Sequence, residues 1–169
     1  IAVDALAALM FTSGSTGEPK GVTLTHRNLA RNTADIAAYL ELSPADRALL
    51  VLPLHYCYGA SVLHTHLLAG ASVVLVSSFM FPEKVLDEMR DTGCTGFAGV
   101  PSTYQVLLRR TRFRERSFPS LRWLQQAGGR LPDAQIREVR AALPGVRFFV
   151  MYGQTEATAR LSYLPPERL

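Results

Sequence analysis

Residues 12–21, TSGSTGEPKG, combine four hydroxyl side chains, three glycines and one lysine within ten positions. Gly14 and Gly17 would let backbone N–H groups approach an anion closely, and Lys20 adds a positive charge. Hydroxyls that could donate to phosphate oxygens belong to Thr12, Ser13, Ser15 and Thr16. The composition predicts a phosphate-binding loop, with a flexible linker as the alternative, since Gly, Ser and Thr runs often solvate their own backbone.

The flanks of this loop favour a folded connector. Residues 5–11, ALAALMF, form an apolar run of strand length, and residues 21–25, GVTLT, place Val22 and Leu24 in alternation with small or polar residues. The loop is therefore expected to join two strands. It differs from a Walker P-loop, because Lys20 stands between Pro19 and Gly21 and not between a glycine and a hydroxyl residue.

A second loop with possible chemistry is MYGQTEATAR, residues 151–160, which follows the apolar run RFFV. Parallel sheets bind ligands at the carboxyl ends of their strands, and this loop would lie at such an end. Tyr152 offers a flat face for a base, and Gly153 permits close backbone approach. Thr155 offers a hydroxyl for phosphate, and Glu156 a hard oxygen ligand for Mg²⁺. Taken alone, this loop is a weak indication.

The remaining sequence predicts elements that could position the two loops. Strand-like apolar runs occupy residues 47–53, 71–76, 94–100, 121–128 and 147–153, in addition to residues 5–11. Helical periodicity fills several of the gaps, with Thr25 as a candidate N-cap and Pro82 and Pro132 as candidate first-turn prolines. Continuous apolar runs are typical of strands buried on both faces. We expect one α/β domain, or a piece of one, with a mostly parallel sheet flanked by helices.

Composition narrows the function classes. The 169 residues are 48% hydrophobic and carry a formal charge of +4, and the longest apolar runs fall short of the roughly 20 residues that a membrane helix needs. With no membrane span and no signal-peptide pattern, a cytoplasmic protein is expected. The basic group at residues 109–116 is interpreted as a solvated helix end and loop, so nucleic acid is not an expected partner. Cys57 and Cys94 are too few for a disulfide framework or a zinc site.

The first loop in the form FTSGSTGEPKGVTLTHRNL, followed some 130 residues later by YGQTEA, resembles the adenylate-forming (AMP-binding) superfamily of acyl-CoA and aryl-CoA synthetases, luciferases and peptide-synthetase adenylation domains. The intermediate segments LPLHYCYG, GVPSTYQVLL and QQAGGRLP are also similar to family segments. The resemblance implies that residues 1–169 are a central fragment of the large N-terminal domain, a partial AMP-binding domain. The C-terminal lid domain, the ribose-binding Asp, the hinge and the catalytic Lys of the family would lie in later sequence.

The resemblance also implies a reaction and residue roles. Family members activate a carboxylic acid with ATP and Mg²⁺, release pyrophosphate and form an acyl-adenylate, which most pass to a thiol. The implied catalytic residues are Lys20, His55, Thr155 and Glu156, with Glu156 as the Mg²⁺ ligand and His55 orienting or gating the carboxylate. The implied nucleotide-binding residues are Thr12, Ser13, Gly14, Ser15, Thr16, Gly17, Lys20, Ala127, Gly128, Gly129, Tyr152, Gly153, Gln154 and Thr155.

The substrate is less defined than the reaction. The stretch LHYCYGAS lacks the Asp that peptide-synthetase domains use for an amino group, so a fatty or aromatic acid is favoured over an amino acid. Tyr56, Tyr58, Val62, Tyr104 and Gly128 fit that interpretation, although each could be an ordinary core residue. Glycine at positions 128 and 129 would leave room for a bulky acyl group. CoA or the phosphopantetheine of an acyl carrier protein is the expected acceptor. A non-catalytic nucleotide-binding module and a purely structural α/β domain stay open as alternatives, and the fragment alone is expected to adenylate poorly.

Overall fold

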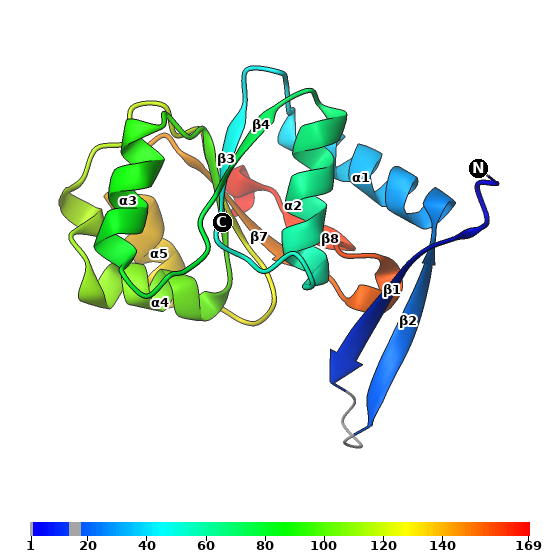
Figure 1. Cartoon of the computed structure of the whole chain (residues 1–169). Helices are drawn as coiled ribbons and strands as arrows, with labels where there is room; N and C mark the ends of the chain where they lie inside the picture. Colours follow the sequence, from blue (N-terminus) through cyan, green and yellow to red (C-terminus); the bar gives the residue numbers. More distant parts are fainter. Residues whose placement is uncertain (1, 14–17) are drawn as a thin grey trace.

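A computed structural model describes residues 2–13 and 18–169, which form a six-stranded sheet, a separate two-stranded hairpin and flanking helices (Figure 1). The strands are β1 Leu6–Ser13, β2 Pro19–Thr25, β3 Arg47–Leu50, β4 Ser72–Leu75, β5 Gly96–Gly99, β6 Trp123–Gln126, β7 Arg147–Tyr152 and β8 Ser162–Leu164. The helices are α1 His26–Leu40, α2 Cys57–Leu68, α3 Pro82–Asp91, α4 Pro101–Arg110 and α5 Asp133–Ala142. Short 3-10 turns are η1 Phe113–Glu115, η2 Thr155–Ala157 and η3 Pro166–Arg168.

The six-stranded sheet has the order β4-β3-β5-β6-β7-β8. All pairs from β4 to β7 are parallel, and β8 joins the edge antiparallel to β7. Both β5 and β6 are buried along their whole length, as their apolar runs predict. The expected α/β class with a mostly parallel sheet is confirmed. The antiparallel strand β8 was not predicted, because its three residues are all exposed and show no strand pattern.

Helices cover both faces of the sheet. Side chains of α1 and α2 pack on one face in a cluster that includes Ile36, Val62, Trp123 and Phe149. The helices α3, α4 and α5 cover the other face around Phe97, Leu124 and Phe148. Trp123 and Leu124 are neighbours on β6 and enter opposite clusters, because successive strand side chains point to opposite faces. This two-sided core fixes the ends of the strands, where the loops begin.

The connection order reverses between β3 and β5. From β3 the chain crosses through α2 to β4 on one side, and it then returns through α3 to β5 on the other side of β3. At such a switch point the loops that leave the carboxyl ends of the two strands diverge and open a crevice. The segments that leave β3 and β5 here lead to Tyr56 and to Val100, so the ligand crevice is expected between them.

Helix starts follow local chemistry. Thr25 caps α1: its Oγ1 accepts a hydrogen bond from the Asn28 N–H at 3.2 Å, and Asn28 Oδ1 accepts one from the Thr25 N–H at 3.0 Å. The predicted N-cap is confirmed, and His26 is the first helical residue. Pro82 begins α3 as predicted, whereas Pro132 precedes α5 as its N-cap residue and does not lie in the first turn.

The strands on either side of the first loop form a hairpin of their own. β1 and β2 are antiparallel, with Thr12 opposite Lys20 and Ser13 opposite Pro19. The prediction that the loop joins two strands is confirmed. The apolar run at residues 5–11 was expected among the strands of the main sheet, and it instead belongs to this hairpin, which projects away from the sheet in Figure 1.

The amino ends of the sheet strands are tied together by one carboxylate. Asp46, 1% exposed, accepts hydrogen bonds at Oδ1 from Thr95 Oγ1 at 2.8 Å and from Arg122 Nη1 at 2.8 Å. Its Oδ2 accepts from the N–H of Ser43 at 2.9 Å. Burial alone would raise the pKa of Asp46, but these hydrogen bonds and the Arg122 charge outweigh it and lower the pKa. The charged carboxylate thus joins the segments that lead into β3, β5 and β6.

The basic group at residues 109–116 is not wholly solvated, which corrects that interpretation. Arg116 is only 12% exposed and forms 2.5 Å ion pairs with Glu83 and Asp87 of α3. Arg114 pairs with Glu138 of α5. Three acidic side chains therefore fasten this segment to two helices. Among residues 2–13 and 18–169, no helix is long and apolar enough to cross a membrane.

Candidate functional site

The crevice at the switch point is built around a glycine turn. Gly128 and Gly129 have φ angles of +81° and +156°, and the Gln126 side chain holds the turn by donating from Nε2 to the Gly129 carbonyl at 2.7 Å. A Cβ on Gly128 would lie 2.5 Å from the Tyr56 Oη and 3.1 Å from Val100 Cγ1. Glycine is needed both for the left-handed backbone and for the close approach of Tyr56. The space beside Gly128, expected to admit a bulky acyl group, is occupied by this hydroxyl.

Four of the predicted nucleotide-binding residues line one large cavity of about 940 Å³: Gly128, Gly129, Tyr152 and Gly153. Tyr152, 61% exposed, lies at its wall with Gly153, and Gly128, Gly129 and Tyr56 line it from the neighbouring loops. An exposed aromatic ring beside backbone of small residues can stack on a planar base. Ala127 is 5% exposed and lies under the turn without lining this cavity.

The loop after β7 folds tightly on itself. A Cβ on Gly153 would lie 1.8 Å from the Ala159 carbonyl oxygen, so this glycine serves the packing of its own loop. Thr155 is half-buried, and its Oγ1 donates to Cys57 Sγ at 3.4 Å. Gln154 and Glu156 are exposed. The loop therefore presents one carboxylate and one amide to solvent, with a hydroxyl beneath them.

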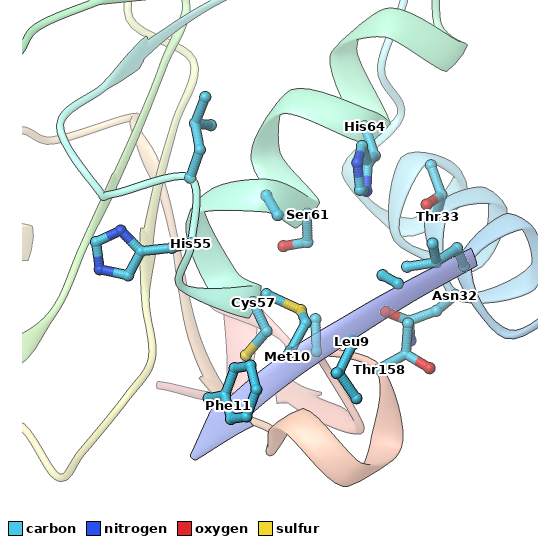
Figure 2. A pocket seen from close by; sticks show the side chains of 15 residues that line it. Leu9, Met10, Phe11, Asn32, Thr33, His55, Cys57, Ser61, His64 and Thr158 are labelled. Atoms are coloured by element: carbon cyan, nitrogen blue, oxygen red, sulfur yellow. The ribbon is translucent and has the colours of Figure 1, made fainter. Parts of the chain in front are cut away.

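A second cavity of about 410 Å³ lies between the hairpin and the helices (Figure 2). Phe11 of β1, Cys57 and His64 of α2, and Thr158 of the second loop reach it from different elements. His64 is half-buried and lines this cavity, whereas His66, two residues further along α2, is fully buried. Strand β2 also contacts η2, so the two motif-bearing segments are neighbours.

The predicted hairpin residues are less completely placed. Thr12 is half-buried at the end of β1, and Lys20 is exposed on β2. Gly14, Ser15, Thr16 and Gly17 lie outside the described residues. His55 is exposed, and its ring is directed away from the other labelled side chains of the cavity in Figure 2. The structure thus brings Tyr152, Gly153, Thr155, Gly128 and Gly129 around the crevice, but it does not bring His55 into it.

The guanidinium of Arg160 and the hydroxyl of Tyr58 are buried beside the crevice. Neither polar group was given a binding role from the sequence. Arg160 is 6% exposed and Tyr58 is 3% exposed, with the guanidinium carbon 5.0 Å from the centroid of the Tyr58 ring. Burial raises the pKa of Tyr58 well above its usual value. Burial also lowers the pKa of His66 in the same layer, so this imidazole is neutral. Arg160 ends the motif MYGQTEATAR, but neither its burial nor its surroundings could be read from that motif.

A row of arginines along the larger cavity was not predicted from the sequence. Arg130, Arg137, Arg140 and Arg168 line it, with Asp133 as the single acidic side chain among its lining residues. Arg137 and Arg140 are three apart on α5, a spacing that places them on one helical face and could have been noticed. These side chains make the wall of the cavity positively charged, which suits a phosphorylated ligand.

The fold and the crevice define a class: an α/β protein with a crevice at the carboxyl edge of a parallel sheet, and with hydroxyl-bearing and glycine-bearing loops beside it. The sequence profile of the family described as AMP-binding enzyme matches residues 1–169. The chain belongs to this AMP-binding enzyme family, as the two sequence motifs predicted.

Individual relatives of the chain are a CoA synthase and a CoA ligase. The chain is 38% identical to a feruloyl-CoA synthase of Amycolatopsis over 160 residues, covering 93% of the chain and 32% of that protein. It is 34% identical to a 2-succinylbenzoate–CoA ligase of Bacillus subtilis, covering 98% and 33%. The chain therefore spans about a third of the length of the curated relatives it matches.

Solved structures agree with the fold. The B. subtilis o-succinylbenzoate CoA synthetase in complex with AMP superposes with a TM-score of 0.86 at 34% identity, covering 98% of this chain and 33% of that one. The same enzyme with ATP and a magnesium ion also gives 0.86. VinN in complex with L-aspartate gives 0.85 at 30% identity, covering 99% and 42%.

Proposed function

We propose that this chain is the central ATP-binding part of an enzyme that joins a carboxylic acid to CoA through an acyl-adenylate, with release of pyrophosphate. The observation that carries this proposal is the convergence of Tyr152, Thr155 and the Gly128 turn at the switch-point crevice of a chain that belongs to the AMP-binding family. Its named relatives are CoA ligases and synthetases, and a structural neighbour was solved with ATP and a magnesium ion.

The chain's residues would divide the nucleotide between them. Tyr152 would stack on adenine, with Ala127, Gly128, Gly129, Gly153 and Gln154 along its edge. The segment from Thr12 to Lys20 would hold the β- and γ-phosphates, and Thr155 would hold the α-phosphate. Displacement at the α-phosphorus depends mainly on positioning and on neutralising charge, which hydroxyls, amides and a lysine can supply.

The crevice fits Mg²⁺ on the chemistry of its donors. Glu156 is an exposed carboxylate beside the half-buried Thr155 hydroxyl, and among the described residues no group of three or more His, Cys, Asp or Glu gathers to hold a metal. Mg²⁺ commonly takes one or two carboxylates together with substrate phosphates and water, so a single Glu suffices. When bound, the ion would neutralise phosphate charge, and Glu156 would fix its position.

The class of acid substrate and the thiol acceptor are inferred from the residues at the crevice and from the names of the relatives. The stretch LHYCYGAS places Tyr56, Cys57 and Tyr58 at the crevice and contributes no carboxylate for a substrate amino group, which favours a fatty or aromatic acid. VinN was solved with L-aspartate, so an amino acid is retained as the alternative substrate. CoA is the favoured acceptor, because the named relatives are CoA-dependent, and a carrier-protein phosphopantetheine is a secondary proposal.

A role for His55 requires movement of its side chain. His55 borders the second cavity, but its exposed ring is turned away from the other labelled side chains there (Figure 2), so rotation about the Cα–Cβ bond would have to precede any contact with a carboxylate. We retain the proposal that it orients or gates the acid. Full turnover is proposed to need sequence outside residues 1–169, since the chain spans about a third of its relatives.

The test is acid-dependent exchange of labelled pyrophosphate into ATP, using the longest natural chain that contains residues 1–169. A panel of fatty, aromatic and amino acids should give exchange with one class and none without acid or Mg²⁺. Treatment with apyrase, which hydrolyses ATP, should remove the signal, because the label counted must be in ATP and not in retained pyrophosphate. Intact ATP binding with no exchange for any acid would replace this proposal with a non-catalytic nucleotide-binding module.

A further inference from the structure

A positively charged side chain is buried at the base of the crevice. Arg160 follows the second motif and is 6% exposed, and its Nη1 donates to Tyr39 Oη at 3.2 Å. Its Nε and Nη2 are buried and have no hydrogen-bond partner among residues 2–13 and 18–169. Two of the three guanidinium nitrogens thus have no acceptor within the described residues.

The charge of this guanidinium also lacks a partner within the described chain. Every Asp and Glu of the sequence lies among the described residues, and none of their ion pairs includes Arg160. The Tyr58 ring, 5.0 Å away, supplies only the weak attraction of an aromatic face for a cation. Burying a cation without an anion is unfavourable, and the usual resolution is a paired anion.

A second orphan donor lies beside the first. Tyr58 Oη is buried and has no hydrogen-bond partner among the described residues, and burial raises the pKa of this phenol, so it keeps its proton at neutral pH. A guanidinium with two free N–H directions and a phenolic O–H can together receive a carboxylate. Within residues 2–13 and 18–169, the Nε and Nη2 of Arg160 and the Oη of Tyr58 therefore lack acceptors.

Tyr58 and Arg160 are among the residues that line one small cavity of about 70 Å³, together with Cys57, Thr155 and Gly128. That volume is several times the roughly 15 Å³ that one water requires, so a small adjustment of the Tyr58 and Arg160 side chains would let a carboxylate group reach their donors. The lining has depth: Thr155 is half-exposed, whereas Arg160 and Tyr58 are buried. A molecule that entered past the half-exposed Thr155 would have its far end on the side of the buried guanidinium.

We propose that Arg160, assisted by Tyr58, receives a second carboxylate of the acid substrate, so that the preferred substrate of this site is a dicarboxylic acid. This inference rests on the proposed function, in which Thr155 lies beside the reacting phosphate. The carboxylate to be activated then lies at the level of Thr155, and the other carboxylate reaches the buried cation. Fatty and aromatic frameworks remain compatible, with the anionic group at the distal end.

The competing explanation places the reacting carboxylate itself on Arg160. The two cases differ in one measurable respect, because a residue that holds the reacting carboxylate acts equally on every acid. A residue that holds a second carboxylate acts only on acids that have one. Matched acid pairs therefore separate them.

The experiment measures pyrophosphate exchange on the longest natural chain that contains residues 1–169, with pairs that differ only in the second carboxylate. Suitable pairs are butyrate with succinate, hexanoate with adipate, and benzoate with phthalate and terephthalate. The wild-type protein should favour the diacid in at least one pair by roughly 100-fold or more in kcat/KM, since buried donors left unpaired discriminate strongly.

Two variants assign the preference. Arg160→Gln should raise KM for the diacid by roughly 100-fold, while KM for ATP and kcat/KM for the monoacid change less than about threefold. Arg160→Lys should recover part of the diacid activity, because it restores charge without the fork of donors. Arg109→Gln, an exposed arginine of α4, is the matched control and should leave both acids unchanged.

Each outcome has a meaning. Exchange that is equal or better with the monoacid in every pair overturns the dicarboxylate proposal and leaves the ligase proposal intact, and this result needs no variant to fold. An equal loss on both acids in Arg160→Gln also overturns it. Absence of exchange with every acid, despite ATP binding, contradicts the ligase function itself.

Discussion

At the scale of single residues, the crevice depends on contacts that leave no room for a methyl group. Gly128 combines a positive φ with a Tyr56 hydroxyl where its side chain would be, and Gly153 faces a carbonyl oxygen of its own loop. Both belong to loops that the sequence assigned to ligand binding. The absence of a side chain at these glycines lets neighbouring backbone and side chains pack closely, and this packing shapes the surface of the crevice.

Gly128→Ala should lower the free energy of unfolding by about 2–4 kcal/mol, because left-handed strain and overlap with Tyr56 add together. The matched control is Gly145→Ala, at φ +88° with nothing within 4 Å of the added Cβ, which should lose only the strain, about 1–2 kcal/mol. Urea denaturation measures both. Tyr56→Phe removes the overlapping oxygen and should recover part of the Gly128→Ala loss; equal losses at the two glycines would contradict the overlap.

Glu156→Gln should weaken Mg²⁺-dependent ATP binding by at least roughly tenfold, because it removes the charged oxygen that the metal prefers. Titration calorimetry with and without Mg²⁺ measures the change. Glu167→Gln, also exposed and at the same charge, is the control. An unchanged dependence on Mg²⁺ would remove Glu156 from the metal site.

Residue types were more predictable than residue environments. The hydroxyls, glycines and Glu156 could be assigned to phosphate chemistry from their types and spacing alone. The burial of Arg160 could not, because it depends on Tyr39 of α1 and Tyr58 of α2, which lie about a hundred or more residues earlier in the chain. The outward orientation of the His55 side chain was also unreadable, since a sequence gives no rotamer.

At the scale of elements, the two edges of the sheet differ in role: one borders the crevice and the other is held together by Asp46. The carboxyl ends of β3, β5, β6 and β7 lead into the crevice, and the amino ends are gathered by Asp46 through Thr95 and Arg122. Parallel strands make this division possible, because all of their amino ends lie at one edge. The element boundaries themselves were largely predictable, since apolar runs and helix-start residues act locally.

Elements without local signals were not predictable. The three exposed residues of β8 become a strand only because β7 offers them a free edge. The hairpin was recognised as two strands, but its separation from the main sheet is a matter of tertiary pairing. Arg116 likewise entered an ion-pair network because α3 happens to present Glu83 and Asp87 beside it.

Asp46→Asn should lower the free energy of unfolding by about 1.5–3 kcal/mol at pH 7, the range for hydrogen bonds to a charged group. The folded-state pKa of Asp46 is lowered, so its contribution is complete above the unfolded value of about 3.9 and is lost as pH falls through the folded pKa. Denaturation at pH 7 and at steps below pH 4 tests this.

The difference between wild type and Asp46→Asn should shrink only below about pH 4. Asp91→Asn, which removes an exposed carboxylate paired with Arg90, should change the stability far less than Asp46→Asn at pH 7. A difference that persists unchanged to pH 2 would show that the charge of Asp46 is not what stabilises the strand ends.

At the scale of the whole molecule, the nucleotide would contact segments from both ends of the sequence. The hairpin begins near the N-terminus, the β7 loop lies near residue 155, and β2 contacts η2 directly. A ligand that spans these segments binds only the folded protein and therefore raises its melting temperature.

ATP with Mg²⁺ at about 100 times its Kd should stabilise the longest natural chain containing residues 1–169 by about 2.7 kcal/mol, a shift of several degrees. Differential scanning calorimetry with ATP and Mg²⁺, against Mg²⁺ alone, measures it. Lys20→Gln should reduce the shift without changing the melting temperature of the free protein. No shift at any concentration would favour the purely structural α/β domain.

The placement of the Asp46 cluster at the edge opposite the crevice bears on how such a protein can change over generations. The loops of the proposed acid pocket lie at the carboxyl ends of the strands and take no part in the Asp46 cluster, so substitutions in those loops can change specificity without separating the strand ends that Asp46 joins. Random libraries confined to the exposed loop residues Tyr152, Gln154 and Glu156 should therefore retain a higher proportion of folded members than libraries of equal size around Asp46, Thr95 and Arg122.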